Sequence, residues 1–237
     1  MPVTPITDPE TEARQVGLGL PSFAYRGLRA LCHAVNRAYF RVSVDGSDVI
    51  PATGAVILAP VHRSNIDFLV VSEVSKRKLF YMAKDSLWRA PRFGTFLASI
   101  GAFPVHREGA DRLALDRSQD VLERGEALIL FPEGTRRSGP VVEELHEGAA
   151  FLAARTGAPI VPIGIGGSAA AMPKGSKMVH PVKIHLVVGT PLAAPARSAR
   201  GRVPRHQVHA LTEDLRAELQ RLYDLAQQRV GARSGTA

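Results

Sequence analysis

Residues 54–68 read GAVILAPVHRSNIDF, an apolar run that passes directly into a dense polar cluster. The run 54–61 opens on a glycine and is rich in aliphatic residues, which is typical of a strand buried on both faces. Ser64 and Asp67 have the spacing of a helix N-cap and its third helical residue. The stretch therefore predicts a buried strand followed by a helix over 64–74.

The same alternation of short apolar runs and amphipathic stretches continues along the chain. Further strands are expected at 79–83, 102–105, 127–132, 159–165 and 182–189, and helices at 91–100, 111–124 and 143–156. Gly125 and Gly157 follow two of these helices, as glycine commonly does at a helix end. The pattern predicts an α/β fold, with a largely parallel or mixed sheet that has helices on both faces.

The two ends of the chain depart from this pattern. Residues 1–44 are expected to form a tail and a basic amphipathic helix, 45–230 a single domain, and 231–237 a disordered tail. Residues 1–15 lack the apolar segment of a secretory signal. After a connector rich in proline and arginine (191–205), a last helix carries an apolar stripe that predicts core packing. The stripe consists of Leu211, Leu215, Leu219 and Leu222.

The segment 22–40 combines apolar residues at helical spacing with charge of one sign. The apolar residues are Phe23, Leu28, Leu31, Val35 and Tyr39. No acidic residue occurs between Ala13 and Val44, whereas five arginines do. Such a helix can lie in a lipid headgroup layer, or it can pack on the domain with its arginines in solvent. The one-signed charge favours contact with an anionic membrane surface.

Composition limits the classes of partner. The 237 residues carry 30 lysines and arginines against 22 acids, a net charge of +8, which suggests an anionic partner: nucleic acid, lipid or a phosphorylated ligand. The aromatic content of 6% argues against binding of single-stranded nucleic acid. The histidines lack metal-ligand spacing, so no metal site is expected. The single cysteine, Cys32, fits a reducing compartment.

His62 and Asp67 form the first candidate site. A carboxylate that accepts a hydrogen bond from one imidazole nitrogen fixes the tautomer and leaves the other nitrogen to take a proton. The alternative is purely structural, with Ser64 and Asp67 capping the helix and His62 as a loop residue. Both interpretations can hold together, because a residue near the helix start has a fixed carboxylate.

The second candidate site is FPEGTRRSG at 131–139, which follows a predicted strand. Backbone amides near a glycine, together with guanidinium groups, suit a phosphate monoester, although the same residues could form an ordinary charged turn. Loops that leave the carboxyl ends of parallel strands collect at one edge of the sheet. We therefore expect this loop to approach His62, joined by Lys84 and Arg107 from two further strand ends.

In combination, these clusters resemble the glycerolipid acyltransferase family. Residues 62–67 (HRSNID) resemble its H-x4-D signature, and residues 131–136 match its F-P-E-G-T-R block. Residues 101–107 resemble a further block and 161–163 the proline-containing fourth. The resemblance covers roughly residues 45–195, in family order.

The resemblance implies a mechanism for the first cluster. His62 is expected to act as the general base that removes the proton of a glycerol hydroxyl, with Asp67 orienting it. The hydroxyl oxygen then attacks an acyl thioester, so acyl-CoA or acyl carrier protein is a co-substrate, and no cofactor or acyl-enzyme is needed.

The resemblance also implies residues that bind the substrate. Arg107 and Arg136, aided by Lys84, would hold the acceptor phosphate, while Glu133, Gly134 and Thr135 would shape the acceptor site. His-Arg-Ser at 62–64 is similar to enzymes that acylate glycerol 3-phosphate, whereas FPEGTR and the proline of GAFPVHR are similar to the lysophosphatidate branch.

The sequence thus predicts a peripheral acyltransferase at the cytoplasmic face of the cell membrane. It would convert lysophosphatidic acid to phosphatidic acid, with no nucleic-acid partner. Glycerol 3-phosphate or a glycolipid is the alternative acceptor. A binder of anionic lipid or nucleic acid without catalysis is the alternative of another class.

Overall fold

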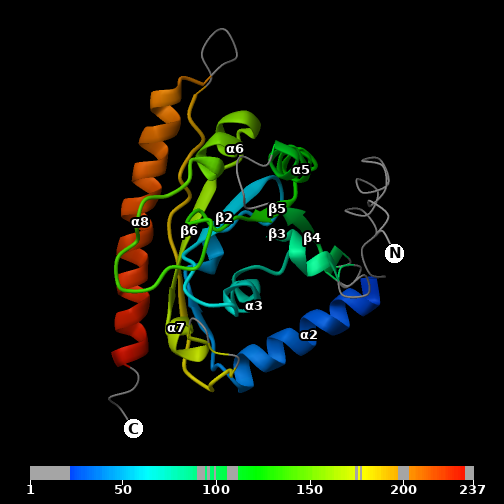
Figure 1. Ribbon diagram of the computed structural model, residues 1–237, viewed down its shortest axis with the longest axis vertical. Helices are drawn as coiled ribbons and strands as arrows, with labels where there is room; N and C mark the ends of the chain where they lie inside the picture. The colour runs from blue at the N-terminus through cyan, green and yellow to red at the C-terminus, as the bar shows by residue number, and fades with distance from the viewer. Residues whose placement is uncertain are drawn as a thin grey trace.

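A seven-stranded sheet is the centre of the computed structural model, which describes residues 22–89, 94, 97, 98, 100–105, 112–173, 176, 178–196 and 203–232 (Figure 1). The strands are β1 (Ser43–Asp45), β2 (Val56–Pro60), β3 (Leu79–Lys84), β4 (Ala102–Val105), β5 (Ala127–Ile129), β6 (Ile160–Gly166) and β7 (His185–Val188). Their order in space is β1-β7-β6-β2-β5-β3-β4.

The direction of the strands places the functional loops. β6, β2, β5, β3 and β4 are parallel, whereas β7 runs antiparallel to β6 and pairs in parallel with β1. The carboxyl ends of the five parallel strands therefore lie along one edge of the sheet. The predicted mixed, largely parallel sheet is confirmed.

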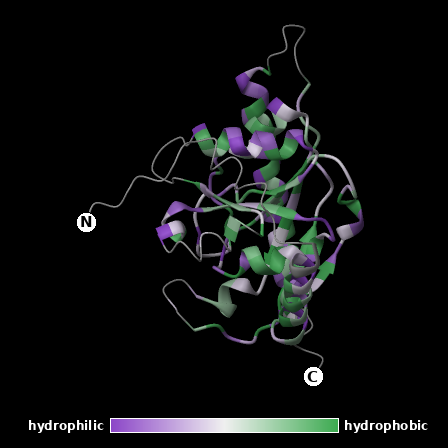
Figure 2. Cartoon of the chain, turned by 90° about the vertical axis from the view of Figure 1, so that its right-hand side faces the viewer, coloured by the Kyte–Doolittle hydropathy of each residue, from purple (hydrophilic) through white to green (hydrophobic). Residues whose placement is uncertain are grey.

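Helices cover both faces of the sheet. On one side α6 (Gly148–Thr156) contacts both α5 (Arg112–Glu123) and α8 (Arg205–Ala232), and on the other side α2 (Ser22–Ala38) contacts α3 (Asp67–Val70) and the 3₁₀ turn η2 (Val71–Val74) (Figure 1). Shorter elements are η1 (Ser47–Val49), η3 (Asp85–Arg89) and α7 (Ser168–Ala171). The central strands are mainly hydrophobic, whereas the helices carry both hydrophobic and hydrophilic residues (Figure 2). β2 and β6 are buried at every position, as their unbroken apolar sequences predict.

The last helix packs on β6 through glycine. A Cβ atom at Gly164 would lie 2.3 Å from the carbonyl group of Leu222, and one at Gly166 would lie 2.4 Å from that of Ala226. The two glycines thus let the backbone of α8 approach the sheet closely. The predicted leucine stripe of this helix is buried, which confirms its packing role.

Two expected helices are shorter than the sequence suggests. The helix expected over 143–156 begins only at Gly148, because tertiary hydrogen bonds hold the preceding segment as a loop: Val142 N–H to Gln220 Oε1 (2.7 Å) and His146 N–H to Pro132 O (2.9 Å). The helix expected over 64–74 is the short α3 followed by η2. The one expected at 91–100 lies largely outside the described residues.

The helix α2 presents an unexpected face to the protein. Its inward contacts are polar: Asn36 donates to Leu69 O (3.1 Å) and Glu73 Oε1 (2.8 Å), and Arg29 donates to Arg77 O (3.0 Å). The apolar side chains Leu31, Val35 and Tyr39 instead face outward, with 61%, 38% and 40% of their surface exposed. In the part of the chain that the structure describes, no helix has the length and apolar character needed to cross a bilayer.

Candidate active site

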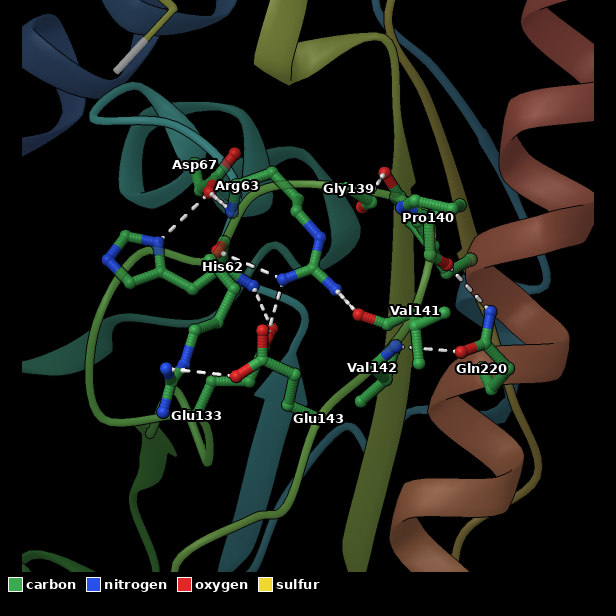
Figure 3. A network of polar contacts seen from close by, with 12 residues as sticks. His62, Arg63, Asp67, Glu133, Gly139, Pro140, Val141, Val142, Glu143 and Gln220 are labelled. Carbon is green, nitrogen blue, oxygen red and sulfur yellow. Dashed lines mark hydrogen bonds and ion pairs between the residues drawn. The ribbon is translucent and has the colours of Figure 1, made fainter. Parts of the chain in front are cut away.

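The polar cluster after β2 brings His62 and Asp67 into contact. His62 Nδ1 lies 3.0 Å from Asp67 Oδ2, and the two side chains are 12% and 0% exposed. Asp67 Oδ2 also accepts the backbone N–H groups of Arg63 (2.6 Å) and Ser64 (2.7 Å). These donors fix the carboxylate, which in turn fixes the imidazole. The second ring nitrogen points away from the network (Figure 3) and can exchange a proton with a bound molecule.

The capping role expected of Ser64 is wrong. Ile66 is the N-cap of α3 and makes no side-chain cap hydrogen bond. Ser64 Oγ instead donates to Met172 O (3.2 Å). One hydrogen bond of the expected capping pattern is present: the Asp67 carboxylate accepts the backbone N–H of Ser64. That bond restrains the same carboxylate that holds His62, so the local structure and the His62 contact depend on one group.

The loop after β5 contacts both the backbone and the ring of His62. Glu133 Oε1 accepts the His62 N–H (2.8 Å), and Arg137 N–H donates to His62 O (2.9 Å). The Phe131 ring stacks on the imidazole, with centroids 4.2 Å apart and planes 29° apart. The two motifs, about seventy residues apart in sequence, therefore form one site, as the parallel-sheet topology predicts.

A buried ion pair that the sequence analysis did not identify joins the motifs. Arg63 donates to Glu133 Oε2, and the two side chains are 1% and 0% exposed. Arg63 also donates to Val141 O (3.1 Å; Figure 3). Its guanidinium group lies over the Tyr223 ring, 4.9 Å from the ring centroid. Both Glu133 oxygens are thus occupied by protein donors. The sequence did contain one signal for this pair: the first motif carries a positive charge, Arg63, and the second carries a negative charge, Glu133.

The rest of the FPEGTR loop is open to solvent. Gly134 has φ +65°, and a Cβ atom there would lie 2.5 Å from His146 Cδ2, so this position requires glycine. Thr135 is exposed, and Arg136 is half-buried. Arg137 is paired with Glu143 (2.9 Å), whereas the structure gives the Arg136 guanidinium no partner among the described residues. Arg136 is therefore the cation of this loop that is available to a ligand.

The two remaining cations expected at this edge are Lys84 and Arg107. Lys84 is the exposed last residue of β3, which is separated from β2 by β5 alone, a lateral distance of about 10 Å. Arg107 lies outside the described residues, shortly after β4. Within the described ranges, no group of three histidine, cysteine, aspartate or glutamate side chains is placed to hold a metal ion.

Comparison with known proteins gives consistent matches. Residues 41–166 match the family model described as Acyltransferase. The 1-acyl-sn-glycerol-3-phosphate acyltransferase of Bacillus subtilis is 31% identical over 152 residues, which cover 64% of this chain and 73% of that protein. The Pseudomonas aeruginosa protein of the same name is 30% identical over 179 residues, 71% of this chain and 63% of its own length.

A solved structure shares the fold. It is the crystal structure of the 1-acyl-sn-glycerophosphate (LPA) acyltransferase PlsC from Thermotoga maritima, with a TM-score of 0.63 and 21% identity. The match covers 87% of this chain and 86% of the Thermotoga chain. The arrangement of strands and helices described above is therefore one already known from a solved protein.

Proposed function

Because this chain belongs to the acyltransferase family, we propose that it transfers a fatty acyl group to the free hydroxyl of lysophosphatidic acid, giving phosphatidic acid. The donor is a thioester, acyl-CoA or acyl carrier protein. The observation that carries the proposal is the buried Asp67 carboxylate 3.0 Å from His62 Nδ1, at the sheet edge where the FPEGTR loop lies. The names of the bacterial relatives support the choice of acceptor.

In this proposal His62 performs the proton transfers. Its free nitrogen removes the proton of the acceptor hydroxyl as the oxygen attacks the thioester carbonyl. The C–O bond forms, the C–S bond breaks, and the imidazolium returns the proton to the departing thiolate. Asp67 keeps the imidazole oriented and stabilises its protonated form, as the carboxylate of a catalytic triad does.

Direct transfer requires no nucleophile from the protein. Cys32, the one thiol of the chain, lies on α2 outside the cluster. Burial, the larger cause, and the Glu73 carboxylate both raise the pKa of the Cys32 thiol. A thiol with a raised pKa is a weak nucleophile at neutral pH, so Cys32 does not offer an acyl-enzyme route.

We propose that Arg136 and Lys84, together with Arg107, hold the phosphate of the acceptor, and that Gly134 and Thr135 shape its site. Glu133 has a different role in this account. Since both of its oxygens are bonded within the protein, it acts as a positioning residue that holds the backbone of His62 and the side chain of Arg63.

Arg136→Ala is expected to raise the KM for lysophosphatidic acid about tenfold or more and to change kcat little. The reason is that a hydrogen bond to a charged group contributes about 1.5–3 kcal/mol. Steady-state kinetics with the acceptor varied at saturating donor measures both constants. Arg137→Ala is the matched comparison, because that guanidinium is already paired with Glu143. Equal KM values for the two variants would remove Arg136 from the acceptor site.

The acceptor itself is tested by product analysis. The purified protein is given one acyl-CoA with lysophosphatidic acid, glycerol 3-phosphate or a glycolipid in separate reactions, and products are identified by mass spectrometry. We expect phosphatidic acid to form fastest. Faster acylation of glycerol 3-phosphate would keep the chemistry but replace the acceptor.

We also propose that α2 lies in the headgroup layer at the cytoplasmic face of the cell membrane, where the acceptor lysophosphatidic acid is available. The support is the way in which this helix is docked. It contacts the domain through Arg29, Asn36 and His33. It leaves Leu31 and Val35 exposed, and Tyr39, just after the helix, is exposed beside them. An exposed apolar stripe on a basic amphipathic helix is the feature that buries itself in a lipid interface.

Replacing Leu31 and Val35 together by glutamate is expected to weaken binding to liposomes about tenfold or more, because two apolar contacts are lost and two charges would enter the interface. Co-sedimentation with vesicles containing phosphatidylglycerol measures the partition. Ala30→Glu/Ala34→Glu is the matched control, since these exposed positions lie to the side of the stripe and add the same charge. If both double variants lose binding equally, charge alone explains the effect and the stripe has no special role.

A further inference from the structure

The loop that leads from the FPEGTR motif to α6, residues 137–147, lies across the last helix of the chain (Figure 1). The chain turns at Gly139, whose φ of +94° lies in the left-handed region that favours glycine. Further along the loop, Val142 and Leu145 are buried in the core. The loop therefore has a fixed position on α8, and the sequence analysis gave this contact no role.

One side chain of α8 holds the middle of this loop. Gln220 Oε1 accepts the backbone N–H of Val142 (2.7 Å), and Gln220 Nε2 donates to Pro140 O (3.0 Å) (Figure 3). The same Nε2 donates to Asp224 Oδ1 (2.9 Å), one helical turn further along α8. That carboxylate fixes the orientation of the amide, because it can accept only from the NH2 end. The amide thus holds the backbone on both sides of Val141.

The carbonyl group of Val141 links the loop to the candidate active site. Its oxygen accepts a hydrogen bond from Arg63 (3.1 Å), whereas the Val141 side chain is exposed. Arg63 donates to one oxygen of Glu133, and the other oxygen of Glu133 accepts the N–H of His62 (2.8 Å). These contacts join Gln220 to the His62 backbone, and we call them the α8–His62 path.

Burial makes this path sensitive to a displacement of the loop. The Arg63 side chain is 1% exposed, so water does not readily replace a lost partner. A buried donor that loses its acceptor costs more than an exposed one. A second contact from the same helix restrains this region, because the Tyr223 ring lies under the Arg63 guanidinium and Tyr223 OH donates to Gly139 O (3.4 Å). A loop that moves therefore takes Arg63 with it or leaves one of its N–H groups unpaired.

We propose that Gln220 is a positioning residue for acyl transfer. It fixes the Val141 carbonyl, to which Arg63 is bonded. Arg63 in turn orients Glu133, which holds the His62 backbone. The inference rests on the proposed function, in which His62 must direct its free nitrogen at the acceptor hydroxyl. Because the rate depends steeply on the placement of a general base, a small displacement of His62 lowers kcat.

Gln220→Leu removes both hydrogen bonds to the loop and keeps the size of the side chain. It is expected to lower kcat about three- to tenfold, the effect of one or two lost hydrogen bonds, with little change in the KM for lysophosphatidic acid. Thr156→Val is the matched control, because Thr156 Oγ1 also accepts a backbone N–H, that of Ala158 (3.2 Å), but at the opposite edge of the sheet. Equal kcat values for the two variants would overturn the proposal.

Hydrogen exchange of the His62 backbone amide, followed by NMR, tests the same path independently of activity. Gln220→Leu is expected to speed this exchange about three- to tenfold, because the bond to Glu133 opens more often, and Thr156→Val to leave it unchanged. Unchanged exchange in Gln220→Leu would overturn the proposal even in an active enzyme. Faster exchange in a protein that transfers no acyl group would confirm the path and contradict the proposed function.

A combined variant separates positioning from a general loss of stability. The α8–His62 path is already interrupted in Arg63→Met/Glu133→Gln, so adding Gln220→Leu there should change kcat less than about twofold. A loss as large as in the wild-type background would show that Gln220 acts on the whole fold, and it would overturn the proposal.

Gln220→Glu is the conservative variant. It keeps an acceptor for the Val142 N–H and loses the donor to Pro140 O, so its kcat and its His62 exchange rate should lie between those of wild type and Gln220→Leu. If Gln220→Leu does not fold, this variant decides. Wild-type values of both quantities in Gln220→Glu would then overturn the proposal.

Discussion

His62→Ala is expected to lower kcat about 10²- to 10⁴-fold, because a positioned general base contributes that much to a proton transfer. The KM for either substrate changes little, since the imidazole acts on the reacting hydroxyl and does not hold the phosphate. Following thiol release at saturating acceptor measures the loss.

The fold of this variant is checked beside its activity. His209→Ala is the control, because His209 lies exposed on α8 and outside the site. It should keep the wild-type rate, and circular dichroism should show both proteins folded. A folded His62→Ala protein with a near wild-type rate would contradict the assignment of the base.

Glu133→Gln is expected to reduce the free energy of unfolding by about 3–5 kcal/mol, because it leaves the Arg63 guanidinium buried without a counter-charge. Urea denaturation followed by fluorescence measures the change. Glu143→Gln provides the scale for an exposed pair, since its bond to Arg137 lies at the surface and its loss costs about 1 kcal/mol or less.

A double variant separates the charge from the packing. Adding Arg63→Met to Glu133→Gln removes the uncompensated cation, so most of the lost stability should return. The amide oxygen of the glutamine can still accept the His62 N–H, so the backbone of His62 should stay held in the double variant. A Glu133→Gln protein as stable as Glu143→Gln would show that the buried pair does not hold the two motifs together.

The sequence predicted the central strands because each is an apolar run that needs no knowledge of its partners. β1 was missed for the opposite reason. It is three residues long, and it is a strand only because Ser43–Asp45 pairs with residues about 140 positions later. The start of α6 was also wrong, since Gln220, on the last helix, binds the backbone of the preceding loop. Such contacts between distant segments leave no local pattern.

The candidate site also has features that the local sequence predicts and features that depend on distant segments. The proximity of His62 and Asp67 could be predicted, because they are five residues apart and Asp67 was expected near the start of the helix that follows His62. The Arg63–Glu133 pair could not, because it depends on how the two loops fold over each other and on the Tyr223 ring from α8. The spacing of apolar residues predicted a helix over 22–40, and the structure has one at 22–38, but the spacing could not show that this helix docks through its polar side chains.

The most direct test of the account is whether thiol release depends on the acceptor. The purified protein is mixed with an acyl-CoA in the presence and in the absence of lysophosphatidic acid, and free thiol is followed with a chromogenic reagent. We expect release only when the acceptor is present, with one phosphatidic acid formed for each thiol. No release with any acceptor, or equal release without one, would contradict transfer by the His62–Asp67 site.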